Sequence, residues 1–96
     1  MSPKITFTST SNGRLFVSAI PQGVCSMQID VALRDGIIED VAFIGGCSGN
    51  SQGLASLLKG MKVADAIQRL EGIDCGGKRT SCPDQLAQLL KQITNQ

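Results

Sequence analysis

Histidine is absent from the 96 residues of this chain, and so are tryptophan and tyrosine. Without histidine the chain lacks the usual general base at neutral pH, the Ser/His and Cys/His nucleophile pairs, and every imidazole metal ligand. The only aromatic residues are Phe7, Phe16 and Phe43, which do not alternate with basic residues as in proteins that bind single-stranded nucleic acid. Any metal must therefore be bound by cysteine sulfur, with at most one carboxylate among its ligands.

An excess of charge of one sign is also lacking, because 9 basic and 8 acidic residues leave a formal net charge of +1. Such a chain creates no strong field that attracts nucleic acid or an anionic membrane surface. No stretch approaches the roughly 18 apolar residues of a membrane span, and none after Lys4 has the length of a signal-peptide core. We therefore expect a cytoplasmic protein with no nucleic acid and no membrane as partner.

The length predicts a single domain over residues 1–96, with an ordered core over about residues 4–94. With 42% hydrophobic residues, the chain should collapse into a packed core. A domain of this size buries only about 60 to 65% of its unfolded surface, so a structural metal would help to stabilise it.

The first half of the chain predicts strands. Alternation of apolar and polar residues is clearest from Met27 to Leu33, and the turns at Ser11-Asn12-Gly13 and Asp35-Gly36 predict antiparallel hairpins. The expected strands cover residues 5–10, 14–20, 27–33 and 37–44.

The second half predicts helices, after a glycine-rich loop over residues 45–50. Apolar residues at helical spacing predict one helix up to about Gly60, a second that ends at Gly72, and a third that is capped by Ser81 or Cys82 with Pro83 in its first turn. Strands followed by helices predict an α+β fold, an antiparallel meander of three or four strands followed by three helices packed on one face.

Four cysteines, Cys25, Cys47, Cys75 and Cys82, favour metal binding or redox chemistry over disulfides in a reducing compartment. If the hairpin ladder runs unbroken from a two-residue turn, Cys25 faces Gly46, and the cysteines at 25 and 47 are diagonal neighbours. A three-residue turn places those two directly opposite each other, and a bulge shifts the register by one residue.

Cys82 lies one turn before Leu86 on the inward stripe of the last helix, and Lys78 and Arg79 carry charge that offsets thiolates. We therefore predict that the four cysteines bind zinc or an iron-sulfur cluster. The spacing of the cysteines matches no standard zinc ribbon or ferredoxin pattern, so the prediction rests on geometry. The alternatives are buried core cysteines and a Cys75/Cys82 dithiol that carries electrons.

The string Thr80-Ser81-Cys82-Pro83-Asp84 is the one that names the TSCPD domain family. The resemblance extends back through the strings Gly23-Val24-Cys25-Ser26, Gly45-Gly46-Cys47-Ser48-Gly49-Asn50 and Leu70-Glu71-Gly72-Ile73-Asp74-Cys75-Gly76. Such domains also occur at the C-terminal end of adenosylcobalamin-dependent ribonucleotide reductases, so the resemblance implies an accessory or docking role beside such a reductase. Cobalamin would enter only within that larger enzyme, because 96 residues cannot supply the barrel that it needs.

The chain bears a more distant resemblance to the NifU-type iron-sulfur scaffold proteins. It is carried by Cys25, Asp35-Gly36-Ile37-Ile38-Glu39-Asp40, Gly46-Cys47, the stretch from Gly60 to Ala66, and Cys82. The resemblance implies a similar fold and an iron-sulfur assembly protein as partner. Met27 stands where that family has aspartate, and Cys75 has no equivalent there, which favours a tighter site than that of a delivery scaffold.

Overall fold

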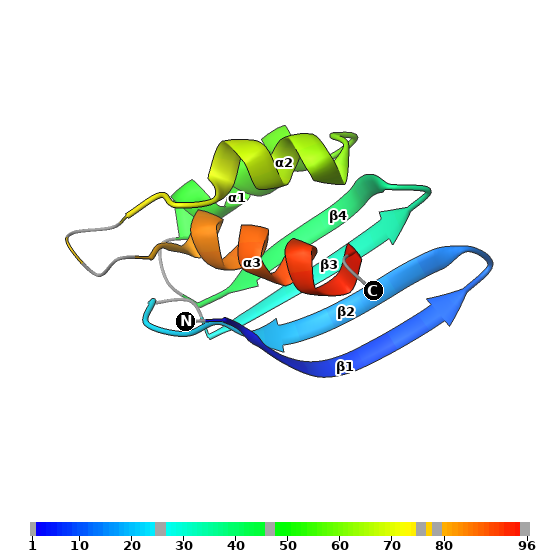
Figure 1. Cartoon of the computed structure of the whole chain (residues 1–96), viewed down its shortest axis with the longest axis horizontal. Helices are drawn as coiled ribbons and strands as arrows, with labels where there is room; N and C mark the ends of the chain where they lie inside the picture. Colours follow the sequence, from blue (N-terminus) through cyan, green and yellow to red (C-terminus); the bar gives the residue numbers. More distant parts are fainter. Residues whose placement is uncertain (1, 25–26, 46–47, 75–76, 78–79, 95–96) are drawn as a thin grey trace.

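The chain folds into a four-stranded antiparallel sheet followed by three helices, as Figure 1 shows, and the predicted α+β fold is confirmed. The computed structural model describes residues 2–24, 27–45, 48–74, 77 and 80–94. The strands are β1 (Lys4–Ser11), β2 (Arg14–Ile20), β3 (Gln28–Arg34) and β4 (Ile37–Ile44), which are neighbours in that order. The helices are α1 (Ser48–Leu58), α2 (Val63–Leu70) and α3 (Cys82–Thr94).

Two tight turns connect the strands where the sequence predicts them. Asn12 and Gly13 have φ angles of 53° and 80°, and Asp35 and Gly36 have φ angles of 52° and 76°. Positive φ at both central residues is typical of type I′ turns, whose twist matches that of antiparallel strands, and Asn-Gly and Asp-Gly adopt it readily.

The pairing of β3 with β4 differs from the unbroken ladder that we predicted. Leu33 pairs with Ile38, but Ala32 pairs with Asp40, so Glu39 is an extra residue and the register shifts by one. The shift brings Val41 to the core side of the sheet together with Ile38. An unbroken ladder would instead have turned Asp40 toward the core, so burial of apolar surface favours the bulge.

The helices cover one face of the sheet, and the core lies between the two layers (Figure 1). Leu86, Leu89 and Leu90 form the fully buried stripe of α3, as their helical spacing predicted. The first helix begins at Ser48, inside the segment that we predicted as a loop. Gly49 and Asn50 are weak helix formers, which hid this first turn from sequence patterns.

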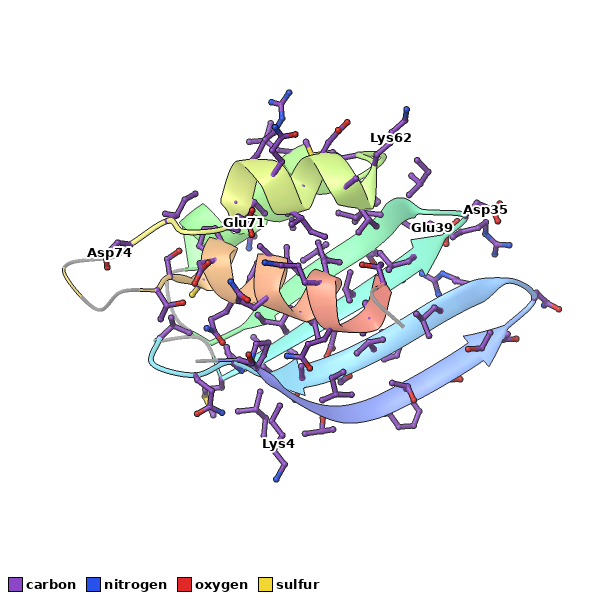
Figure 2. All side chains as sticks on the ribbon, in the orientation of Figure 1. Lys4, Asp35, Glu39, Lys62, Glu71 and Asp74 are labelled. Carbon is purple, nitrogen blue, oxygen red and sulfur yellow. The ribbon has the colours of Figure 1, made fainter. Side chains whose placement is uncertain are left out.

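The segments that bear the four cysteines meet the described elements at one end of the domain. At this end β2 and β4 finish, β3 and α1 begin, α2 finishes and α3 begins, on the left of Figure 1. Figure 2 shows Asp74 at this end, which we call the cysteine end, while Asp35 and Glu39 lie at the opposite end.

The sheet edge formed by β4 is covered by the connection between α1 and α2. Ile37 forms a bridge with Lys62, the N–H of Ile38 donates to the carbonyl oxygen of Met61 at 2.9 Å, and the N–H of Gly60 donates to the carbonyl oxygen of Ile38 at 2.7 Å.

Among the described residues, no helix has both the length and the apolar character needed to cross a membrane.

Glu39 bridges two arginines at the turn end of the sheet (Figure 2). Its Oε1 lies 2.7 Å from Nε of Arg14 and its Oε2 lies 2.9 Å from Nε of Arg34. The hydrogen bond from Arg14, followed by that from Arg34, lowers the pKa of Glu39 below its usual value.

We expect an NMR titration to find the pKa of Glu39 below that of an unperturbed glutamate. Because the folded pKa is the lower one, the stabilisation by the bridge is present above the unfolded pKa and is lost as the pH falls through the folded pKa. Arg14→Gln should raise the pKa of Glu39 more than Arg34→Gln does, and an unchanged pKa in both variants would contradict the bridge.

Candidate functional site

Of the predicted ligands, Cys25, Cys47 and Cys75 lie outside the described residues, and Cys82 is the half-buried first residue of α3. No group of three or more acidic, cysteine or histidine side chains that could hold a metal ion occurs within the described residues. The metal ligands therefore remain a prediction, and what the structure describes is the set of contacts that holds the neighbouring segments.

The first turn of α3 is capped by Ser81. Its Oγ accepts a hydrogen bond of 3.1 Å from the backbone N–H of Asp84, three residues further on, which is the geometry of an N-cap. Of the two predicted caps, Ser81 is therefore the one observed, and Cys82 is the first residue inside the helix.

The carboxylate of Asp84 is buried and connects the end of α2 to the start of α3. Its Oδ1 accepts hydrogen bonds from the N–H of Gly72 at 2.7 Å and from Nε2 of Gln88 at 3.3 Å, and its Oδ2 accepts one from the hydroxyl of Thr80 at 2.5 Å. Burial by itself would raise the pKa of Asp84, but the hydrogen bonds from Thr80, Gly72 and Gln88 outweigh it and lower the pKa. The carboxylate is thus held ionised as an acceptor.

Gln85 extends these contacts to the loop between β2 and β3. Its fully buried side chain accepts a 2.8 Å hydrogen bond from the backbone N–H of Gln22 through Oε1 and donates a 3.0 Å hydrogen bond through Nε2 to Oγ1 of Thr80. We call the side chains of Thr80, Ser81, Asp84 and Gln85 the α3 polar network. Within the described part of the chain, no buried side-chain nitrogen or oxygen lacks a hydrogen-bond partner.

The α3 polar network joins the segments that carry three of the four cysteines. Gln22 precedes Cys25 by three residues, Gly72 precedes Cys75 by three, and Cys82 precedes Gln85 by three. Backbone N–H groups of the first two segments bind side chains of α3 directly. Three points of the chain, each three residues from a cysteine, are therefore held at the start of one helix.

The fourth segment is attached through the β3–β4 hairpin. The last described pair is Gln28 with Ile44, and the N–H of Met27 donates to the carbonyl oxygen of Ile44 at 2.7 Å. Gly45 has a φ of 82°, a backbone conformation that favours glycine, and a Cβ added there would also lie 3.0 Å from Cγ of Met27. Cys25 precedes Gln28 by three residues and Cys47 follows Ile44 by three.

Sequence reasoning missed the α3 polar network. The Ser-x-x-Asp spacing is a capping signal that predicts the contact between Ser81 and Asp84. No sequence pattern indicates that Gln85 is fully buried, because its partners come from residue 22 and residue 80.

The profile of the TSCPD domain family matches residues 4–94, nearly the whole chain. Searches of the curated proteins and of the solved structures found no match. They therefore give no support to the resemblance to NifU-type scaffold proteins. The Thr-Ser-Cys-Pro-Asp string that carries the family name is, in this fold, the start of α3 and most of its polar network. The chain belongs to the TSCPD domain family.

Proposed function

We propose that this protein binds zinc or an iron-sulfur cluster through the thiolates of Cys25, Cys47, Cys75 and Cys82. The observation that supports this function is the α3 polar network, which holds Gln22 and Gly72 against the helix that begins with Cys82. Buried polar side chains of this kind give a small domain little more stability than apolar ones, but they fix the relative positions of loops.

The distances along the chain are compatible with one shared site. Three extended residues span at most about 10 to 11 Å, so Cys25 and Cys75 each lie within that reach of a point bound to α3. The hairpin links Cys47 to the same end of the domain through Met27 and Ile44.

The donor set also fits the proposed metal. Four thiolates suit tetrahedral zinc and iron-sulfur clusters, and a chain without histidine offers no imidazole nitrogen as an alternative ligand. Bound metal would supply cross-links that stabilise a domain with a small core, and a cluster would also supply electron transfer. In this proposal the protein works in the reducing cytoplasm, where thiolates persist.

Metal analysis of protein purified without oxygen tests this proposal. We expect about one zinc ion per chain and no colour, or iron with acid-labile sulfide and visible absorption. The measurement is elemental analysis combined with a visible spectrum and a thiol titration on the same sample. Metal-free protein with four reactive thiols would contradict both forms of the site.

A second candidate function is an accessory redox or docking module for a larger protein, such as a ribonucleotide reductase or an iron-sulfur assembly protein. It is favoured by exposed apolar side chains near the cysteines: Met27 is 71% exposed, Ile44 44% and Ile73 41%. Exposed apolar residues that gather at one end are typical of interaction sites. In this alternative the Cys75/Cys82 dithiol carries the electrons.

The two functions differ in how the thiols behave. A dithiol carrier should show one reversible oxidation, confined to Cys75 and Cys82 and reduced by a thioredoxin-like protein. A metal site should instead protect all four cysteines from alkylation until a chelator removes the metal. Alkylation followed by mass spectrometry distinguishes these patterns.

A further inference from the structure

The two edges of the sheet differ in a way that the proposed metal site does not explain. The β4 edge is bonded to the connection between α1 and α2 through Ile38, Gly60 and Met61. In the described part of the chain, β1 pairs only with β2, and no other segment lies along its outer side. An uncovered edge strand presents a row of N–H and C=O groups that can pair with another strand.

The usual protections of an edge strand are confined to the beginning of β1. The charge of Lys4 and the register shift between Ile5 and Phe7 disfavour pairing of that part with another strand. From Phe7 to Ser11 the strand has no charge, no proline and no register shift, and all its side chains are exposed. Three of its five residues, Phe7, Thr8 and Thr10, are of types that favour strands, which suits further strand pairing.

Phe7 supplies an apolar contact beside the open edge. Its ring packs against that of Phe16 in a T-shaped arrangement, with a centroid separation of 6.2 Å, yet 54% of Phe7 is exposed. Phe16 covers the side toward β2, so the exposed part of the ring is available to a strand added next to β1.

We propose that β1 pairs in antiparallel orientation with β1 of a second copy of this chain, which forms a continuous eight-stranded sheet. A second copy fits because two identical strands that pair in antiparallel orientation are related by a two-fold axis. The N–H groups of each strand then face the carbonyl groups of the other. The stretch is neutral, so the pairing brings no like charges together. With the axis at Thr8, residues 7–9 of both copies pair directly within the regular stretch, and Thr8 lies opposite Thr8 of the second copy.

The contact area of two strand edges and two phenylalanine rings is at the small end of specific interfaces. We therefore expect a dissociation constant of roughly 10 to 100 μM. In this dimer the cysteine ends of the copies point in opposite directions, because the strands run antiparallel. Failure of the dimer would leave the proposed metal site unaffected, and the two proposals are tested by separate measurements.

Sedimentation equilibrium of the whole chain, with reductant present to exclude intermolecular disulfides, tests this pairing. The mass should rise from 10.1 kDa toward twice that value as the concentration increases from about 5 μM to about 1 mM. Thr8→Lys and Thr8→Glu should each weaken dimerisation at least tenfold, because each places like charges opposite one another across the axis.

The decisive sample is an equimolar mixture of the Thr8→Lys and Thr8→Glu chains, which should restore the dimer because opposite charges then meet. Gln68→Lys, at an exposed position of α2, is the matched control and should dimerise like the natural chain. Natural chain that stays monomeric at 1 mM, a Thr8→Lys variant that dimerises normally, or a mixture that stays monomeric would each overturn the proposal. Circular dichroism of every variant checks that the fold is retained.

Discussion

Asp84→Ala is expected to lower the free energy of unfolding by about 3 to 5 kcal/mol, a large part of the stability of a small domain. The variant removes a buried carboxylate that accepts hydrogen bonds from Gly72, Thr80 and Gln88. The donors of Gly72 and Thr80 would then be left without an acceptor, and each buried unpaired group costs about 1 to 3 kcal/mol. Urea unfolding at neutral pH measures the loss.

Two further variants make this prediction specific. Asp84→Asn keeps one oxygen that can accept from the N–H of Gly72, but its amide NH2 group cannot accept from the hydroxyl of Thr80. The loss of unfolding free energy in this variant should therefore be intermediate. Glu39→Ala also removes a carboxylate with two hydrogen-bonded partners, but this side chain is partly exposed to solvent and the loss of stability should be much smaller. If Asp84→Ala were as stable as Glu39→Ala, the α3 polar network would have no role in stability.

Replacing any one of Cys25, Cys47, Cys75 and Cys82 with serine is expected to abolish stoichiometric metal binding. A serine hydroxyl is a poor ligand for zinc or iron beside three thiolates, so metal content should fall from about one site per chain to less than about a tenth of that. Because metal binding is coupled to folding, the melting temperature should fall by about 10 °C or more in all four variants. Elemental analysis and thermal unfolding measure both effects.

The decisive comparison is between Cys25→Ser and Cys82→Ser, which come from opposite halves of the chain. A shared four-thiolate site predicts equal effects, whereas a Cys75/Cys82 dithiol predicts that Cys25→Ser remains close to the natural protein. Gln68→Ala, at an exposed position of α2, serves as the control for nonspecific loss. Unequal losses, with Cys25→Ser harmless, would favour the redox alternative.

Elements whose cause is local were predictable from the sequence. The Asp35-Gly36 turn follows from two residues that readily adopt positive φ, and α3 follows from the spacing of Leu86, Leu89 and Leu90 together with Ser81 as its cap. The order of strands and helices then restricts the fold to an α+β arrangement. The family resemblance carried by the Thr-Ser-Cys-Pro-Asp string also needed no coordinates.

The bulge in β4 was predictable only in part. The apolar residues Ile38, Val41 and Phe43 do not alternate regularly across Glu39 and Asp40, and this break in period is a signal of the register shift. The turn alone predicted an unbroken ladder, because a turn specifies only the pairs next to it. Burial of Val41 then decides the register further along the strand.

By itself the sequence determined the types of the elements and their order, because each depends on residue type or on neighbours a few positions away. Only the tertiary structure decided that Gln22, Gly72 and Gln85 meet at the start of α3. Those contacts join residues up to 63 positions apart, and a hydrogen bond between such distant groups leaves no periodic trace in the sequence. They depend on the packing of the leucine stripe of α3 on the sheet, which places the polar first turn of α3 beside both loops.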